Sequence, residues 1–190
     1  MTHAPFRELL ATPGVREVCH LRGRLGFMAY HGGALEEMTD VVASAAAARS
    51  GASYYAVLQP TGHEHHIPSH RVSPHESARL HRFLAHVDTV ITIHGFGRHG
   101  YWTSLLLGGQ NRALAHHVAG HLREHLPDYH VETDMERIPS DLRGLHRHNP
   151  VNLPRRQGLQ IELPPRVRVS SPHTESLIKA LAAAAGDWSG

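Results

Sequence analysis

Cysteine and long apolar runs are almost missing from this sequence. Cys19 is the single cysteine in 190 residues, which excludes an internal disulfide and every zinc site built from several thiolates. No apolar run approaches the roughly 20 residues that cross a bilayer, so we expect no transmembrane helix and no membrane partner. Residues 1–14 lack a basic segment followed by an apolar one, which is the pattern of a secretory signal. We therefore expect a cytoplasmic protein.

Excess positive charge is also missing. The 19 Lys and Arg residues face 17 Asp and Glu residues, which leaves a net charge of +2, and Lys179 is the only lysine. No basic block marks a nucleic-acid-binding arm, so we expect no specific nucleic-acid partner. Histidine, in contrast, is abundant, with 20 residues. Because histidine titrates near neutrality, this excess either favours an acidic substrate at lower pH or reflects compositional drift.

Apolar and turn patterns alternate between those of strands and those of helices. The predicted strands cover residues 15–21, 25–30, 53–58, 89–93, 101–107, 129–132 and 159–163. The predicted helices cover residues 38–49, 111–126 and 174–185, and a further helix begins at Ser73, with Pro74 and Glu76 in its first turn. No repeat or linker divides the chain, so we expect one domain over residues 1–190. This alternation indicates the α/β class, with a mixed, mostly parallel sheet that helices cover on both faces.

Three predicted strands lead into residues that ligate metals. The first runs into His31 and then, after two glycines, Glu36; the second runs into His94, and the third contains Glu162. In open α/β sheets, ligands bind at the carboxyl ends of the strands. A catalytic zinc site needs three protein ligands, an open position for water and a separate carboxylate as base. Two histidines and two glutamates at one sheet edge meet that requirement.

Each of these residues also has a purely structural interpretation. A His-x4-Glu spacing arises by chance in a chain with 20 histidines and 17 acidic residues, and a histidine such as His94 commonly hydrogen-bonds a loop. Glu162 is more informative, because a carboxylate in an apolar strand is costly unless it is paired or bound to a metal. Gly32-Gly33 after His31 allows a sharp turn, and we expect Gly95 to keep the backbone clear of the site. Together these features favour the metal site.

Five short motifs follow one another along the chain. They are Tyr30–Glu36, Ser69–Pro74, Ile93–Gly95, Gly108–Asn111, and Asn152 with Gly158–Pro164. In order and approximate spacing, over residues 25–168, they resemble the zinc-dependent poly-γ-glutamate hydrolases, a phage and bacterial family with a carboxypeptidase-like α/β fold. The first motif is similar to that family's His-Gly-Gly-x-x-Glu signature, and the second is similar to its Thr-His-Phe-Asp-Glu-Pro segment.

The resemblance implies one zinc ion per chain, held by His31, Glu36 and His94, with Glu162 as the general base. It also implies hydrolysis of an amide bond, which in that family is the γ-linked amide of polyglutamate. The expected partner is therefore a small-molecule or polyanionic peptide-like substrate.

Two loops differ from the family pattern. Residues 71–73 read Arg-Val-Ser in place of Phe-Asp-Glu, and residues 62–66 form an inserted-looking Gly-His-Glu-His-His segment. This segment does not fit a metalloprotease helix, whose second histidine comes four residues after the first, and we interpret it as a solvated loop at the rim of the cleft. We expect both differences to lie where the substrate binds, which leaves the identity of the substrate open.

Four further residues are candidates for substrate binding. His70 is a candidate to help hold the developing oxyanion. Asn111 and Arg112, at a predicted helix start, either grip a substrate carboxylate or form an N-cap and a surface arginine. Asn152 belongs to the last shared motif.

Two alternative functions stay open from the sequence. The loop differences also fit a related zinc carboxypeptidase or an N-acyl-amino-acid deacylase on the same scaffold. The alternative from another class is a non-catalytic, phage-related protein that binds zinc or associates with DNA, although the dispersed arginines predict only weak binding to DNA.

Overall fold

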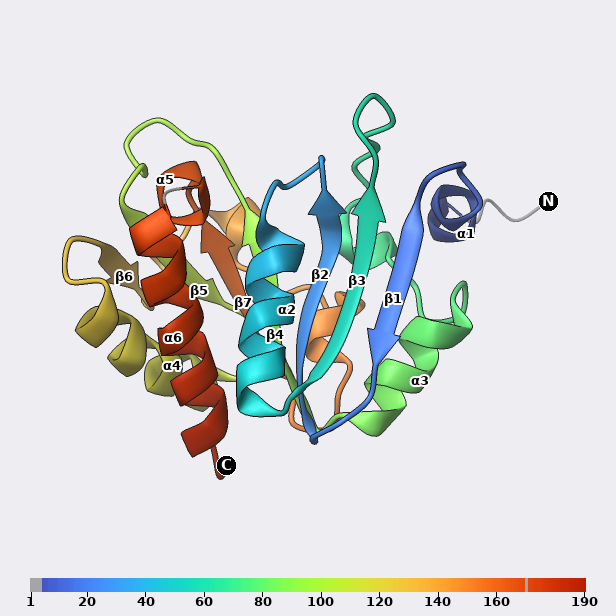
Figure 1. The fold of residues 1–190 in the computed structure, drawn as a ribbon. Coiled ribbons are helices and arrows are strands. Elements are labelled where there is room, and N and C mark those ends of the chain that lie inside the picture. Colours follow the sequence, from blue (N-terminus) through green and yellow to red (C-terminus); the bar gives the residue numbers. More distant parts are fainter. Residues whose placement is uncertain (1–4, 170) are drawn as a thin grey trace.

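Seven strands form one mixed sheet in the computed structural model, which describes residues 5–169 and 171–190 (Figure 1). The strands are β1 (Arg16–His20), β2 (Leu25–Gly33), β3 (Ser53–Gln59), β4 (Thr89–Gly95), β5 (Ser104–Gly108), β6 (His130–Glu132) and β7 (Gly158–Leu163). Their order across the sheet is β1-β3-β2-β4-β7-β5-β6. The central strands β3, β2, β4 and β7 run parallel, whereas β1 is antiparallel to β3 and β5 is antiparallel to β7. The predicted α/β class with a mixed, mostly parallel sheet is confirmed.

Helices cover both faces of the sheet (Figure 1). One face packs against α2 (Thr39–Ser50), α4 (Arg112–His125) and α6 (Ser171–Asp187), and the other packs against α1 (Pro5–Leu10) and α3 (Ala78–His86). The remaining helices are α5 (Pro165–Val169) and the short 3₁₀ helices η1 (Ser69–Arg71), η2 (Ser140–Leu142) and η3 (Pro150–Asn152). None of the helices in the described ranges is long and apolar enough to cross a membrane.

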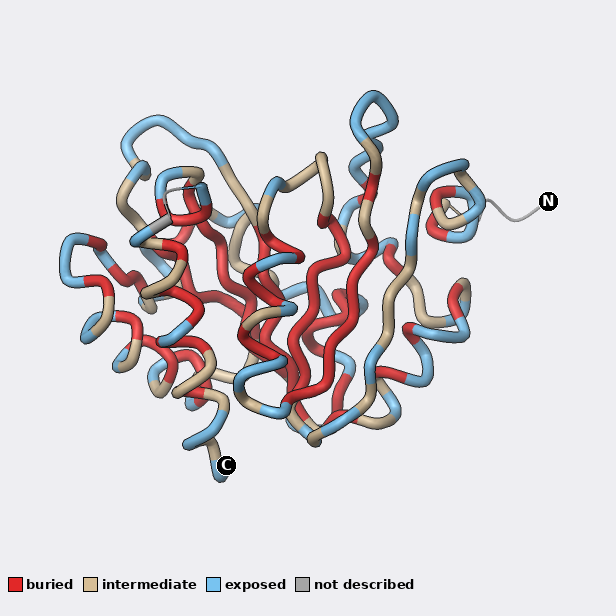
Figure 2. Tube along the Cα trace, viewed as in Figure 1, coloured by how far each residue is buried: buried red, intermediate tan, exposed pale blue. Residues whose placement is uncertain are grey.

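The central strands are buried on both faces of the sheet (Figure 2). In β4, Val90 faces the core beneath α1 and α3, whereas Ile91 and Ile93 face the core beneath α2, α4 and α6. Apolar side chains fill both layers because helices cover a parallel sheet on each side. The buried polar side chains His94 and Glu162 therefore stand out at the carboxyl ends of these strands.

The start of α3 differs from the prediction. The N-cap is Ser77, whose hydroxyl oxygen accepts the Leu80 N–H at 3.0 Å, and the helix begins four residues beyond the predicted Ser73-Pro74 start. Glu76 does not serve this helix. Its carboxylate accepts hydrogen bonds from the Phe6 and Arg7 N–H groups of α1 at 2.9 and 3.0 Å. Glu76 therefore caps α1, a helix distant in sequence, and not α3 as the local pattern predicts.

Three other elements depart from the sequence pattern. The strand predicted over 101–107 begins at Ser104, because a turn closed by the Ser104 N–H on the Tyr101 carbonyl occupies the residues before it. The last helix begins at Ser171 rather than at 174. Helix α1 was not predicted, since its six residues bury only Phe6 and Leu9 and are too few to show a period.

Candidate metal centre

A β-bulge near the end of β2 aims His31 at the site. Ala29 of β2 pairs with Ala56 of β3, and Gly32 pairs with Leu58, so three steps along β2 match two along β3. An extra residue of this kind re-aims a side chain. Tyr30 and His31 would point to opposite faces in a regular strand, but their rings meet at a centroid distance of 4.9 Å. Both side chains therefore reach the same cluster.

The turn after β2 returns Glu36 to His31. The Glu36 N–H donates to the His31 carbonyl at 2.9 Å. Gly33 has a φ of 72°, and a Cβ there would lie 2.3 Å from the Gln59 carbonyl oxygen, so only glycine fits. The Gly33 N–H donates to Asp40 Oδ1 at 3.0 Å, which ties the turn to α2. The glycine pair therefore allows the turn, as the sequence predicts.

His94 and Glu162 stand side by side at the ends of β4 and β7. They are register partners in this parallel pair of strands, so their side chains project from the same face of the sheet. Their exposed fractions are only 3% and 5%. The structure thus brings to one sheet edge the four residues that we selected as ligands and base, which also include His31 and Glu36.

The Glu36 carboxylate lies between the two histidines. Its Oε1 is 2.8 Å from His31 Nδ1, and its Oε2 is 3.2 Å from His94 Nδ1 and 2.9 Å from the Gly95 nitrogen. Burial acts to raise the pKa of Glu36, but the charge of His94 and the hydrogen bonds from both histidines outweigh it and hold the pKa well below its ordinary value. Glu36 is therefore ionised, the state in which a carboxylate ligates a metal.

The second ring nitrogen of each histidine makes a fixed hydrogen bond. His31 Nε2 lies 2.9 Å from the Ile67 carbonyl oxygen, which only accepts, so this nitrogen carries a proton. His94 Nε2 lies 2.9 Å from the Tyr30 hydroxyl. Metal-ligating histidines typically donate one ring N–H to a neighbouring oxygen and keep the other nitrogen for the metal. Here both Nδ1 atoms are left to face the Glu36 carboxylate.

The Tyr30 hydroxyl has a defined donor and acceptor side. Asn149 Oδ1 accepts the Val151 backbone N–H at 3.2 Å and the Tyr30 hydroxyl at 3.1 Å. Burial raises the pKa of Tyr30 far above its ordinary value, so the hydroxyl keeps its proton and donates it to Asn149. Its oxygen then accepts from His94, which fixes the proton of that ring on Nε2.

The same chain of hydrogen bonds continues to Glu162. Asn149 Nδ2 donates to Gln160 Oε1 at 2.9 Å, and Gln160 Nε2 donates to Glu162 Oε1 at 2.9 Å. The pKa of Glu162 is raised to about 7, and burial is the largest cause. The charge of Glu36 also raises this pKa, whereas the charge of His94 and the hydrogen bond from Gln160 lower it. A carboxylate whose pKa lies close to neutrality is suited to accept and return a proton.

An open cavity of about 510 Å³ lies at these strand ends. The proposed ligands and base line it, and so do Asn149 and Gln160 of the hydrogen-bond chain. His70, the candidate for oxyanion binding, also lines the cavity, and its ring packs against that of His146 at a centroid distance of 4.7 Å. The structure therefore places His70 on the cavity wall together with the proposed base.

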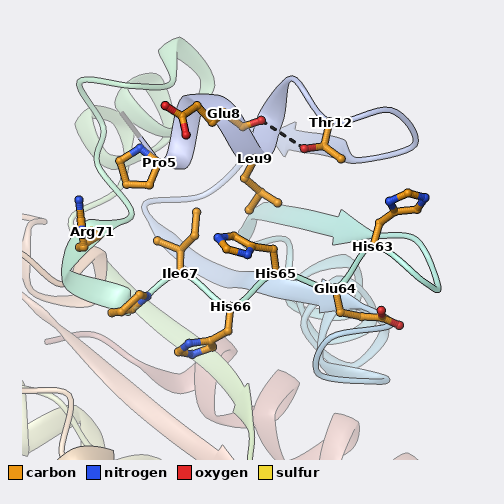
Figure 3. A pocket seen from close by; sticks show the side chains of 11 residues that line it. Pro5, Glu8, Leu9, Thr12, His63, Glu64, His65, His66, Ile67 and Arg71 are labelled. Atoms are coloured by element: carbon orange, nitrogen blue, oxygen red, sulfur yellow. Dashed lines mark hydrogen bonds between the residues drawn. The ribbon is translucent and has the colours of Figure 1, made fainter. Parts of the chain in front are cut away.

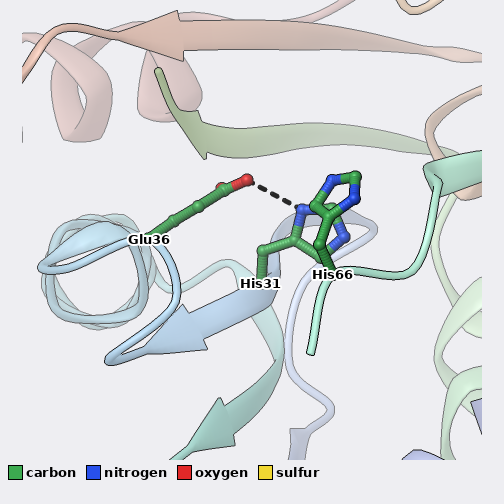
Figure 4. Close-up of side chains that lie close together, drawn as sticks. All are labelled: His31, Glu36 and His66. Carbon is green, nitrogen blue, oxygen red and sulfur yellow. Dashed lines mark hydrogen bonds and ion pairs between the residues drawn. The ribbon is translucent and has the colours of Figure 1, made fainter. Parts of the chain in front are cut away.

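His66 approaches the same cluster (Figure 4). One ligand atom each from His31, Glu36 and His66 lie within 4.8 Å of one another, and the His31 and His66 ring centroids are 4.7 Å apart. We expected the segment of residues 62–66 to form a solvated rim, and no motif singled out its last histidine. The signal was the density of histidines there, but only the path of the loop shows which one reaches the site.

A second hollow of about 450 Å³ lies beside this loop, between it and α1 (Figure 3). His66 and Pro68 line both hollows, whereas Arg71 lines only the second of the two. Val72 is buried in the core. None of residues 71–73 lines the cavity at the strand ends, which corrects the expectation that these substitutions lie there. The inserted-looking segment reaches that cavity through His66.

The other three candidates for substrate binding lie away from the cavity lining. Asn111 is the N-cap of α4, and its Oδ1 accepts the Leu114 N–H at 2.9 Å. Arg112 donates to three backbone carbonyls at 2.6 to 3.3 Å. Asn152 donates to the carbonyls of Gly144 and His146 at 2.7 and 3.1 Å. Asn152 thus holds the loop that carries His146, and all three side chains serve the fold.

Gly95 has a different role from the one that we expected. A Cβ at this position would lie 2.7 Å from the guanidinium carbon of Arg168, so the glycine makes room for that side chain. Arg168 is buried and donates to two backbone carbonyls. Burial lowers its pKa, and the charges of nearby carboxylates, Glu36 and Glu162 among them, oppose this effect. A buried cation therefore lies close to the two acidic residues of the site.

The seven-stranded sheet with helices on both faces is the fold of the metallo-carboxypeptidases. The structure is similar to that of a bacteriophage poly-γ-glutamate hydrolase, with a TM-score of 0.78, 18% identity, and coverage of 93% of this chain and 91% of that chain. It is also similar to YNDL, described as zinc-free, with a TM-score of 0.68, 18% identity and coverage of 88% and 89%. A putative carboxypeptidase from Burkholderia mallei gives a TM-score of 0.57 at 14% identity, over 96% of this chain and 65% of that chain.

A sequence comparison then identifies the family. The family model described as poly-γ-glutamate hydrolase matches residues 9–177. The chain therefore belongs to the poly-γ-glutamate hydrolase family, whose members are zinc-dependent hydrolases of amide bonds. This match confirms the resemblance drawn from the five motifs. Comparison with curated proteins finds no match.

Proposed function

We propose that this chain hydrolyses the γ-glutamyl amide bonds of poly-γ-glutamate, with one zinc ion held by His31, Glu36 and His94. The observation that carries the proposal is the orientation of the two imidazoles. Nδ1 of each ring faces the same ionised carboxylate, while Nε2 is committed to a hydrogen bond. Two imidazoles and one carboxylate suit zinc and leave a position for water. Membership of the family supports the substrate.

Glu162 serves as the general base in this proposal. His31, Glu36 and His94 would hold the zinc ion, which would supply Lewis-acid chemistry by polarising the amide carbonyl and acidifying the attacking water. Glu162 takes the proton of that water and returns it to the amine nitrogen as the C–N bond breaks. Gln160 fixes one oxygen of this carboxylate through its hydrogen bond of 2.9 Å. His70, on the cavity wall, is the candidate donor to the developing oxyanion.

The cavity also suits an anionic polymer. His66, His70 and His146 line it, and an imidazole N–H can donate a hydrogen bond to a carboxylate. Arg168 adds a cation buried close to Glu36 and Glu162, which offsets part of their negative charge. The cavity is open, so a chain that carries one carboxylate per residue can reach the base from solvent.

The test combines metal analysis with a polymer digest. The chain is purified without a histidine tag, its zinc content is measured, and poly-γ-glutamate is incubated with it. We expect about one zinc per chain and a loss of polymer length, and we expect polyglutamate with α-linked residues, the matched control, to stay intact. Protein that holds no zinc and leaves the γ-linked polymer unchanged would contradict the proposal.

A related zinc carboxypeptidase or N-acyl-amino-acid deacylase is the second candidate. Its support is that His66, from a segment that departs from the family pattern, lines the cavity, together with the similarity of the fold to the putative carboxypeptidase. The same experiment separates the candidates once N-acyl-amino acids are added to the α-linked control, because a carboxypeptidase releases single residues from α-linked peptides and a deacylase releases the acyl group of N-acyl-amino acids. Cleavage restricted to the γ-linked polymer favours the first candidate.

A further inference from the structure

His66, the last residue of the segment 62–66, lines the cavity, and the proposed function gives it no part in binding the ion. Its imidazole offers a ring nitrogen that lies within 4.8 Å of a ligand atom of His31 and of one of Glu36 (Figure 4). These are two of the three residues that the proposed function assigns to the ion. His66 therefore lies close enough for its imidazole to bind the same ion.

The backbone on both sides of His66 is fixed. The His65 N–H donates to Gln59 Oε1 at 2.7 Å, and Gln59 Nε2 donates back to the His65 carbonyl at 3.1 Å. On the other side, Ile67 is buried, and its carbonyl accepts from His31 Nε2 at 2.9 Å. The segment is thus anchored to the end of β3 and to the proposed ligand His31. With the backbone held on both sides, the side-chain torsions of His66 are the degrees of freedom that set the position of its ring relative to His31 and Glu36.

We propose that His66 is a fourth protein ligand of the zinc ion in the resting state of this chain, where it competes with water for the open position. The inference rests on the proposed function, since it takes the ion at His31, Glu36 and His94 as its starting point. Zinc sites with four protein ligands are closed, whereas catalytic sites keep one position for water or substrate. Binding of His66 closes the site, and rotation of its side chain opens it.

X-ray absorption spectroscopy of the zinc-loaded full chain tests this ligand directly, because it counts the imidazoles bound to the ion. We expect three imidazoles in the wild type and two in His66→Ala. His65→Ala is the matched control. His65 is the adjacent residue, its ring lines the second hollow and not the cavity, and its bonds to Gln59 use only backbone atoms. We expect three imidazoles in this control.

Zinc affinity and turnover give two further readouts. We expect His66→Ala to bind zinc at least about tenfold more weakly in competition with a chromophoric chelator, since loss of even an outer partner of a ligand has an effect of that size. We expect its turnover of poly-γ-glutamate at saturating zinc to exceed that of the wild type, because water no longer competes with a histidine. His65→Ala should match the wild type in affinity.

Each contrary result has a defined meaning. Two imidazoles in the wild type, or equal zinc affinity in the wild type and His66→Ala, would overturn the inference. An equal loss of affinity in His65→Ala would assign the effect to the loop and overturn it too. Lower turnover of His66→Ala at saturating zinc would refute competition with water. A wild type that binds no zinc contradicts the proposed function itself, whereas one that binds zinc through two imidazoles and cleaves the polymer contradicts only this inference.

Discussion

Replacing Glu162 with glutamine removes a proton acceptor from the cavity and keeps the shape of the side chain. The amide oxygen of the variant can accept from Gln160 as Oε1 of the carboxylate does. Because Glu162 is not among the proposed ligands, we expect Glu162→Gln to bind zinc as the wild type does. Turnover should fall by about 10² to 10⁴, the usual effect of losing a general base. The metal-free variant should also be more stable than the metal-free wild type.

The gain in stability follows from the pKa of Glu162. In the unfolded chain the carboxyl ionises at its ordinary value of 4.5, whereas burial raises the pKa in the folded chain to about 7. Below pH 4.5 both states hold the proton, and ionisation favours neither. As the pH rises from 4.5 to 7, the unfolded state loses the proton first, and the folded state loses about 3 kcal/mol relative to it. Glutamine cannot ionise, so the variant does not undergo this loss.

Urea denaturation in the presence of a chelator measures the difference between the two proteins. The free energy of unfolding of Glu162→Gln minus that of the wild type should grow from near zero at pH 4.5 to about 3 kcal/mol at pH 8. Glu124→Gln, at an exposed position of α4, controls for the loss of one negative charge. A difference that stays constant with pH would refute the reasoning. Loss of zinc from Glu162→Gln would instead make Glu162 a ligand and Glu36 the candidate base.

Three further predictions concern the ligands and their partners. In chelator competition, His31→Ala and His94→Ala should abolish tight zinc binding, and Glu36→Ala should weaken it at least about tenfold. The control is His81→Ala, at an exposed position. Full zinc content in all three ligand variants would make the ligand assignment wrong. Zinc affinity should fall as the pH drops, beginning above pH 6.5. Burial acts to lower the pKa of His94, but the charge and hydrogen bond of Glu36 outweigh it and raise that pKa, and a histidine must be neutral to bind the ion. An affinity that is constant down to pH 4 would contradict this. Tyr30→Phe should weaken zinc binding about 10- to 100-fold, because His94 loses the acceptor of its Nε2–H. Unchanged binding in that variant would show that the hydroxyl is not needed to orient the ring.

The strand-end residues could be predicted from the sequence because their positions follow from local patterns. His94 and Glu162 continue buried apolar strands, and parallel strands bring their carboxyl ends to one edge of a sheet. Gly33 before Glu36 marks the tight turn. The orientation of His31 could not be predicted, because it depends on a bulge between β2 and β3, and pairing between strands leaves no mark in the sequence of one of them.

The partners of these residues come from distant segments, and this is why the sequence did not show them. Asn149 is 119 positions from Tyr30, in a stretch without a regular period. Gln160 carries a weak signal, since it alternates with Glu162 on one face of an otherwise apolar strand. Arg112 shows the opposite case. Its position at a helix start is typical of anion binding, but its guanidinium N–H groups donate to backbone carbonyls in the folded chain.

The backbone N–H of Val151 gives the hydrogen-bond chain a single direction. This group cannot titrate or reverse, so it orients the amide of Asn149, which in turn orients that of Gln160. Gln160 therefore presents an N–H to Glu162 Oε1 at every pH at which the fold is intact. Because Oε1 already accepts this N–H, protonation of Oε1 is less favourable than protonation of Oε2. When Glu162 is protonated, the proton accordingly resides on Oε2, so the two oxygens of the proposed base differ: Oε1 holds the side chain in place, and Oε2 is the atom that would carry the proton.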